Sequence, residues 1–452
     1  MKEKIKKPIK VIVFLVVFVI LFFTAQWCFI NHADPSYQNI NGFYKQTENS
    51  LDAVYIGSSN CFTYWNPAVA WDEYGVAIYS YSANNLLFES AEYIIKDCVK
   101  TQPYAKFIVN INTLIGDELE MKEIQYTASN MPLSLNRFQL VNHLCDIGNL
   151  SFSERMEYYF PIIRFHGNYS SLMPGNLLFK NDGFKGSSTY EPYVRITTDV
   201  SSVYGKSDEI GELPEYLVES TNSLLDYCDN NGIEVVFVTV PQARSEEKNK
   251  VFNALNKLIS DRGYQTLNLM EKTDEIGIDR TCDFYNIQHT NIHGSIKFTH
   301  YITQYMIEKY GFTDKRGDKN YADWDGMTEG YFNAVSPYIL DVERDVRKRD
   351  FTLDSPDNLT IFEGTLTWDA TKNAEYYHVY KKVGKTKPWT RVAEKLTDTS
   401  YFDESFADGC IYTVVPVVTN NGEEYYGNFP YLGVPIDDKD VGSAKADEPL
   451  ED

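Results

Sequence analysis

A nearly unbroken apolar run from Val11 to Ile30 constrains this 452-residue chain more than any other feature. A helix of that length extends about 30 Å, which matches the hydrocarbon core of a bilayer. Five lysines precede the run, namely Lys2, Lys4, Lys6, Lys7 and Lys10, and no further lysine follows until Lys45. This asymmetry predicts a single-pass protein of the cell membrane, with its N-terminus in the cytoplasm and the bulk of the chain outside.

A cleaved signal peptide is the alternative interpretation of the same run. The run ends Phe23-Thr-Ala-Gln-Trp-Cys28, which places a bulky Phe at the third position before a cut after Ala25. Gln26 and Trp27 before Cys28 also fit poorly with a lipoprotein signal. We therefore expect residues 1–31 to remain as a cytoplasmic lysine segment and a transmembrane anchor.

Composition limits the classes of protein to consider. A hydrophobic content of 43% indicates a folded chain, and its length suits one large domain and one small one. The net charge of −22 repels phosphate backbones, so nucleic acid is not an expected partner. Seven scattered cysteines without a C-x-x-C pair predict neither a disulfide framework nor a zinc site, although one bridge stays open.

Short apolar segments alternate with helical ones after residue 50. The predicted buried strands are residues 53–56, 78–81, 107–111, 235–240 and 266–269. The main predicted helices are residues 88–100, 215–229 and 295–310. Strands that alternate with helices predict an α/β fold in which helices cover both faces of a parallel sheet, giving three layers.

Two segments depart from this rhythm within the large domain, which we place at residues 32–349. Residues 32–51 are predicted to be a polar connector. Residues 117–205 form a long insertion rich in Tyr, Asn and Ser, with a helical piece at 152–159, and it is either a lid or a structural insertion. A charged helix at 327–348 is predicted to close the domain.

The pattern changes after residue 350 to short alternating segments separated by turn residues. The predicted strands are residues 365–368, 376–380, 390–392 and 410–417, a pattern typical of a β-sandwich. The residues Leu366-x-Trp368, Tyr376-Tyr377-x-Val379 and Tyr412-x-Val414 resemble a fibronectin type III module over about residues 350–436. Residues 437–452 are polar and acidic, and we expect a disordered tail.

Two distant motifs point to chemistry. Gly57-Ser58-Ser59-Asn60 follows the first predicted strand, where a serine nucleophile could project from a tight turn. The second motif is Asp283-Phe284-Tyr285-Asn286-x-x-His289-Thr290-Asn291-x-x-Gly294, just before a predicted helix. A histidine that accepts a serine proton needs a partner for its other ring nitrogen, and a side chain three residues earlier in one loop meets that need.

Together these motifs resemble the SGNH (GDSL-like) hydrolase superfamily, in particular membrane-anchored members from Gram-positive bacteria. Such members read G-S-S-H with a nearby proline, and later D-F-Y-D-x-x-H-L-N-x-x-G-A-x-K-F. This chain has Pro67 after its first motif and continues Gly294-Ser295-x-Lys297-Phe298 after its second. The resemblance covers about residues 50–310. It implies a flavodoxin-like sheet and O-acyl ester chemistry, often on cell-envelope glycans, and a membrane-bound O-acyltransferase as a partner.

The resemblance assigns roles residue by residue. Ser59 matches the nucleophile and His289 the base. The oxyanion donors of the family are the serine N–H, a glycine N–H of the second block and an asparagine side chain of the third. Here the second block carries Ser82 or Asn85 in place of glycine, and Asn112 follows the third strand. Asn291 is the further substrate-binding candidate in the late motif.

Asn286 stands where the family has the aspartate of the triad. An amide can hold the imidazole ring, but it carries no charge to stabilise an imidazolium and can select the wrong tautomer. Asp283, six residues before His289, could take its place, or a Ser–His dyad could suffice. No metal and no cofactor is implied.

Three functions therefore remain open. The first is an acyl esterase or O-acyltransferase that acts on an acylated envelope polymer or extracellular glycan, with activity impaired by Asn286. The second is a non-catalytic relative that uses the same cleft to bind glycan or a partner. The third is an adhesive module that displays its fibronectin-like domain.

Overall fold

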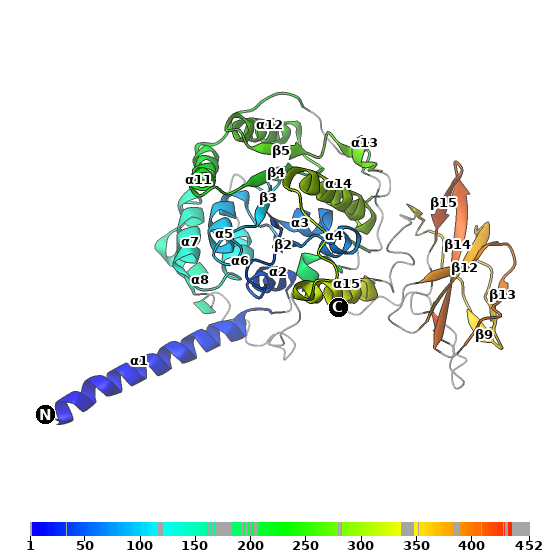
Figure 1. Cartoon of the computed structure of the whole chain (residues 1–452), viewed down its shortest axis with the longest axis horizontal. Coiled ribbons are helices and arrows are strands. Elements are labelled where there is room, and N and C mark those ends of the chain that lie inside the picture. Colours follow the sequence, from blue (N-terminus) through cyan, green and yellow to red (C-terminus); the bar gives the residue numbers. More distant parts are fainter. Residues whose placement is uncertain are drawn as a thin grey trace.

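The computed structural model describes most of the chain, with gaps concentrated in the long insertion and at the C-terminus. The described residues are 2–32, 34–115, 121–160, 162–163, 167, 183–190, 193–194, 198, 200–202, 207–278, 280, 283–335, 348–350, 352–383, 389–407, 409–427, 429 and 433–435. Helix α1 (Lys2–Phe29) projects from the body (Figure 1). Its segment Ile9–Phe29 is long and apolar enough to cross a membrane by length and composition.

A five-stranded parallel sheet forms the centre of the large domain. Its strands are β1 (Ala53–Gly57), β2 (Ile78–Ser82), β3 (Lys106–Asn110), β4 (Val235–Thr239) and β5 (Gln265–Asn268). Their spatial order is β2-β1-β3-β4-β5, and every neighbouring pair is parallel. This order reverses direction between β1 and β3, and α/β sheets place ligand sites beyond the carboxyl ends of strands at such a point. The predicted α/β fold is confirmed at this level.

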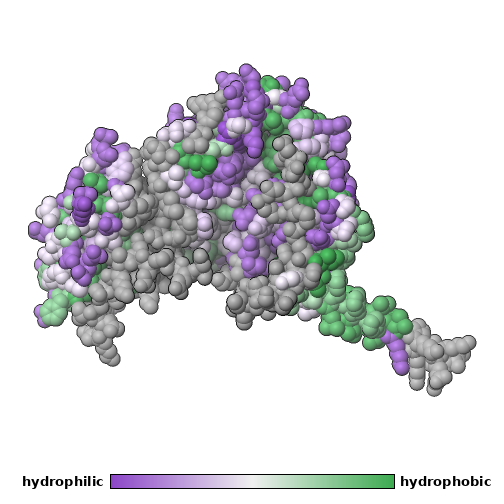
Figure 2. Space-filling view, turned by 180° about the vertical axis from the view of Figure 1, so that it is seen from behind, coloured by the Kyte–Doolittle hydropathy of each residue, from purple (hydrophilic) through white to green (hydrophobic). Residues whose placement is uncertain are grey.

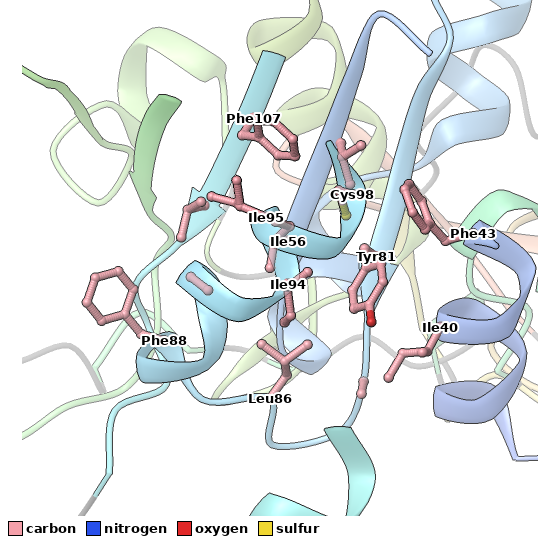
Figure 3. Packing of buried hydrophobic residues seen from close by; sticks show 14 of the residues in the cluster. Ile40, Phe43, Ile56, Tyr81, Leu86, Phe88, Ile94, Ile95, Cys98 and Phe107 are labelled. Carbon is pink, nitrogen blue, oxygen red and sulfur yellow. The ribbon is translucent and has the colours of Figure 1, made fainter. Parts of the chain in front are cut away.

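Both faces of the sheet are buried, which explains why its strands read as continuous apolar segments. On one face Val54, Ile56, Phe107 and Phe237 belong to a large core, part of which is shown in Figure 3. On the other face alternate residues such as Tyr55, Ile108 and Val236 belong to a second core. The sheet is therefore the middle of three layers.

The helices of the large domain fill the outer layers and the long insertion. They are α2 (Pro35–Phe43), α3 (Ser59–Tyr64), α4 (Pro67–Tyr74), α5 (Ala91–Cys98), α6 (Met121–Ala128), α7 (Leu135–Ile147), α8 (Phe152–Tyr159), α11 (Glu215–Asn231), α12 (Glu246–Asp261), α13 (Thr273–Ile276), α14 (Ile292–Tyr310) and α15 (Ala322–Val335). Short 3-10 turns occur at Phe88–Ser90, Gly183–Gly186 and Lys319–Tyr321. Part of the insertion, including residues 171–182, lies outside the described residues.

Two predictions about helices need correction. The polar connector contains helix α2, which Asp34 caps by accepting a hydrogen bond from Ser36 N, and which buries Ile40 and Phe43. Its many polar residues concealed a short amphipathic face. The closing helix begins earlier than predicted, at Ala322, and Lys348 lies in strand β8 (Lys348–Arg349); residues 336–347 lie outside the described residues.

The C-terminal domain is formed by strands, as predicted. One sheet contains β9 (Thr360–Phe362), β10 (Thr365–Thr367) and β13 (Ser400–Phe402). The other contains β8, β11 (Tyr376–Val383), β12 (Thr390–Leu396), β14 (Cys410–Asn420), β15 (Glu423–Tyr426) and β16 (Val434–Pro435). Nearly all of these pairs are antiparallel, and Leu366, Trp368, Val379 and Tyr412 share one core. The tail at 437–452 lies outside the described residues.

Candidate active site

Ser59 lies at the carboxyl end of β1, where the chain turns into α3. The turn depends on Gly57, because a Cβ atom there would lie 2.7 Å from the Cβ of Asn110 on the neighbouring strand. Ser58 precedes the helix, and Ser59 is its first residue. Cys61 N donates to the carbonyl of Ser58 (2.8 Å), whereas the backbone N–H groups of Ser59 and Asn60 precede the first hydrogen bond of the helix. Ser59 is half-buried and lines a cavity.

His289 approaches Ser59 from a small hairpin formed by β6 (Phe284–Asn286) and β7 (His289–Thr290). The Nε2 atom of His289 lies 2.9 Å from the Oγ atom of Ser59. On the other side of the ring, Nδ1 lies 3.1 Å from Oδ1 of Asn286. The structure thus brings together three predicted residues that are 230 positions apart at their widest.

The orientation of the Asn286 amide determines which ring nitrogen carries the proton. Its Oδ1 atom also accepts hydrogen bonds from the backbone N–H groups of Gln288 (2.8 Å) and His289 (3.0 Å). A flipped amide would point N–H groups at these two donors, so the oxygen must face the ring. Nδ1 of His289 therefore donates to Asn286, and Nε2 is left to accept a proton from Ser59. This is the tautomer that a general base requires.

Burial lowers the pKa of His289 to about 4. Asn286 supplies no negative charge to offset this loss of solvation, so the ring is neutral at pH 7. A neutral ring can accept a proton, but the imidazolium that forms is poorly stabilised. The ring of Tyr285 lies parallel to that of His289, with centroids 5.5 Å apart and an interplanar angle of 8°.

Asp283 does not face His289 in this structure. Its fully buried carboxylate lies 2.7 Å from Nζ of Lys297 on α14. Its backbone carbonyl accepts a hydrogen bond from Asn291 N, and Oδ1 of Asn291 accepts one from Gly294 N at the start of α14. Asp283 and Asn291 therefore hold the hairpin against the helix, and Asn286 is the residue beside the ring.

Removal of Lys297 should destabilise the protein more than removal of the charge on Asp283. Lys297→Met is expected to lower the free energy of unfolding by about 3 kcal/mol, because it removes the ammonium group that lies 2.7 Å from a buried carboxylate. Asp283→Asn is expected to lower the free energy of unfolding by a smaller amount, because the Lys297 side chain is 24% exposed and its ammonium group can be solvated by water. Chemical denaturation of the two variants measures the difference, and equal losses would contradict this account of the pair.

The predicted oxyanion residues occupy different positions. A cavity of about 490 Å³ is lined by Ser59, Asn60, Asn85 and Asn112 among others. Asn85 has a φ of +52°, a conformation that favours glycine and that asparagine tolerates better than most residues. Ser82 is fully buried, accepts a hydrogen bond from Asn39 and does not line this cavity.

Asn112 is bound at both ends of its amide. Its Nδ2 atom donates to the carbonyl of Val240 (2.8 Å) and to Oε1 of Gln242 (3.2 Å), while Oδ1 accepts from Val240 N (2.8 Å). Both amide hydrogens are therefore used to join the ends of β3 and β4. The prediction that Asn112 donates to an oxyanion does not fit this arrangement.

Several residues of the site were not predicted from the sequence. Gln242, Arg244 and Lys248 line the same cavity, and they follow β4 just as Ser59 follows β1. The Arg244 guanidinium lies 3.8 Å from the ring centroid of Phe252. Tyr64 donates hydrogen bonds to the carbonyls of Pro241 and Gln288, which joins the loop after β4 to the histidine hairpin. The sequence signal that could have identified Gln242, Arg244 and Lys248 is their position just after the buried strand β4.

A second, larger cavity of about 1000 Å³ lies on the other side of Arg244 and Phe252. It contains neither Ser59 nor His289, but its lining is rich in asparagine. Asn249, Asn253 and Asn256 follow one face of α12, and Asn268 ends β5. Arg244 and Phe252 line both cavities, so the two are neighbours.

Within the described residues no group of three or more His, Cys, Asp or Glu side chains is placed to hold a metal ion. The described cysteines carry free thiols, and they are Cys28, Cys61, Cys98, Cys145, Cys228 and Cys410. Cys282 lies outside the described residues.

Comparisons with known proteins add one similarity. No protein family model matches the chain, and no curated protein matches it. Among solved structures, the chain is similar to a Fn3-like protein from Clostridium thermocellum, with 28% identity over 17% of this chain and 88% of that one, and a TM-score of 0.15. Because that TM-score is low, the C-terminal architecture rests on its strand pairing alone.

Proposed function

We propose that this chain is a membrane-anchored serine ester hydrolase or O-acyltransferase of the SGNH type, which acts outside the cytoplasm on an acylated glycan or envelope polymer. The observation that carries the proposal is the hydrogen-bonded series Ser59–His289–Asn286, with the ring in the tautomer of a general base. The strand order and the position of Ser59 beyond β1 support the same family. The C-terminal domain is proposed to be fibronectin type III-like.

The proposed reaction uses the residues that surround Ser59. Nε2 of His289 accepts the hydroxyl proton as Oγ attacks the acyl carbonyl, and the negative oxygen that forms is held by backbone N–H groups. The proposed donors are the backbone N–H groups of Ser59 and Asn60, in the first turn of α3, and of Asn85. The protonated ring then gives its proton to the departing alcohol, which leaves the acyl group on Ser59. Water or a second hydroxyl completes hydrolysis or transfer in the same way.

The neighbouring cavity supports a polyhydroxylated substrate. Amide side chains both donate and accept hydrogen bonds without carrying charge, which suits sugar hydroxyl groups. The Oδ1 atoms of Asn256 and Asn268 are buried and have no hydrogen-bond partner within the described part of the chain. The cavity extends from Arg244, beside the proposed acyl site, so one glycan could occupy both.

A covalent acyl intermediate tests this proposal. Full-length protein in detergent, incubated with an aryl acetate and quenched with acid, is expected to gain one acetyl group on the peptide that contains Ser59. Mass spectrometry of the digested protein locates the group, because the neighbouring Ser58 is distinguished by fragmentation. Modification of other residues only would contradict the assignment of Ser59 as nucleophile.

A non-catalytic glycan- or partner-binding protein is the second candidate. The low pKa of His289 and the uncharged Asn286 favour it, because both weaken the base when the imidazolium forms. In that case the protein would bind an acylated glycan without forming an acyl intermediate. The membrane-bound O-acyltransferase that the family resemblance implies would then be a candidate partner.

A further inference from the structure

The C-terminal end of helix α1 packs against the folded body. The ring of Phe22 packs against that of Phe160, just after α8, with centroids 5.7 Å apart and an interplanar angle of 66°. Phe14, Phe18 and Phe22 stack along one side of α1, with centroids 6.4 Å and 6.0 Å apart. Gln26 is only 4% exposed. The last two turns of α1 therefore lie against the body.

The length of α1 sets the depth of this contact in a membrane. The apolar span Ile9–Phe29 contains 21 residues and extends about 31 Å, so all of it is needed to cross a hydrocarbon core. Phe22 lies seven residues before the end of the span, or about 10 Å inside it. A side chain that contacts Phe22 from outside the helix is then at the level of the acyl chains.

Apolar side chains are exposed at the same end of the body. Arg137 joins the loop before α7 to the end of α8, because its guanidinium donates to the carbonyls of Met131 (2.9 Å) and Tyr158 (3.3 Å). At this end Leu133 is 47% exposed, Leu135 75% and Ile163 44%. We call Leu133, Leu135, Phe160 and Ile163 the α7–α8 apolar end. In Figure 2 the hydrophobic surface of α1 continues onto the adjoining part of the body.

The α7–α8 apolar end carries fewer acidic residues than the rest of this chain. Aspartate and glutamate make up 64 of the 452 residues, yet residues 124–145 contain neither, and residues 158–163 carry no charged side chain. The opposite end of the α7–α8 pair carries Asp146 and Glu154, and Glu157, in the last turn of α8, is the one acidic residue near the apolar end in that helix. An apolar surface with so few carboxylates suits a bilayer with anionic lipid, which would repel them.

We propose that the α7–α8 apolar end is a membrane-binding surface that inserts into the outer leaflet beside α1. The folded domain then rests on the bilayer in a defined orientation, instead of moving freely on a tether. The occupant of this surface is lipid, and the surface is continuous with the anchor through the contact between Phe22 and Phe160.

Depth-dependent fluorescence quenching tests the proposal in the full-length protein. A genetically encoded fluorescent amino acid is placed at residue 135, and in a second sample at residue 152, and each protein is reconstituted into nanodiscs. The phosphatidylcholine carries bromine near the top of its acyl chains, so that it quenches fluorophores at that depth. Residue 135 is expected to be quenched several-fold more than residue 152.

Phe152 provides a matched control. It is 75% exposed, like Leu135, but begins α8 at its acidic end. Thermal unfolding that matches the unlabelled protein shows that both samples are folded. Equal quenching at the two positions would overturn the proposal. No quenching at residue 135 would also overturn it, including the case in which another protein, and not lipid, covers this surface. A label at residue 163 gives a second measurement and is expected to behave like residue 135.

Discussion

Replacement of Ser59 by alanine is expected to abolish labelling by a fluorophosphonate and to lower ester hydrolysis by about 10³-fold or more. The Oγ atom of Ser59 is the acceptor of the acyl group in the proposed reaction, and it lies 2.9 Å from Nε2 of His289. Alanine keeps the helix start and removes only this atom. Hydrolysis of an aryl acetate by the detergent-solubilised full-length protein gives the rate.

Ser58→Ala is the matched control for this experiment. Ser58 is the neighbouring serine, is 2% exposed, and accepts a hydrogen bond from Thr113 at 2.7 Å. Its replacement is expected to leave labelling intact. A Ser59→Ala protein that hydrolyses the ester as fast as the unmodified protein would favour the non-catalytic function.

The replacement Asn286→Asp is expected to raise kcat by about 10² to 10⁴-fold, the reverse of the loss that the opposite change causes in a serine protease. The carboxylate introduced lies where Oδ1 of Asn286 now accepts from Nδ1 of His289 and from two backbone N–H groups. These donors suit a carboxylate, so the loop should keep its shape. The new charge stabilises the imidazolium that forms when Ser59 loses its proton.

The same replacement should change the pH dependence of the rate. In the unmodified protein the pKa of His289 is about 4, so the base is neutral and the rate falls only near and below that pH. A neighbouring carboxylate favours the protonated ring and raises this pKa. The fall in rate therefore moves toward neutral pH, and the gain from Asn286→Asp is larger at pH 8 than at pH 5.

A double variant separates this effect from unrelated hydrolysis. The gain from Asn286→Asp is expected to disappear when Ser59→Ala is also present. If Asn286→Asp does not raise the rate and Ser59→Ala does not lower it, the enzymatic proposal should be abandoned. Both outcomes are measured with the same ester and the same protein preparation.

Much of the fold could be predicted because each central strand is buried on both faces. Residues 53–56 and 235–240 read as continuous apolar segments, and the structure places β1 and β4 there. Residues 215–229 were likewise predicted as a helix, and the structure buries Leu217, Leu224, Leu225 and Cys228 at helical spacing on one face of α11. Helix α2 was missed because its few buried side chains are surrounded by polar residues, and only packing against the body separates it from a loop.

The candidate site could be predicted only in part. The local spacing of Asn286 and His289 was sufficient to predict their hydrogen bond, because three residues of one hairpin bring them together. Arg244 and Gln242 carry no recognisable spacing, and they reach the site because β4 lies beside β3 in the sheet. Asn112 resembled a donor by its position after β3, but its hydrogen bonds to Val240 and Gln242 use both amide hydrogens.

The sequence by itself determined the apolar anchor, the α/β pattern and the strand-rich C-terminal domain, because these follow from composition and short-range spacing. It also gave Ser59, His289 and Asn286 as candidates, through two short motifs that resemble those of a known superfamily. Only the tertiary structure decided that Ser59 meets His289, that Asp283 pairs with Lys297 and that the Asn286 oxygen faces the ring. These features depend on where distant strands end and on which donors surround each side chain. Contacts between residues far apart in the sequence produce no periodic pattern in it, so they become visible only in the folded structure.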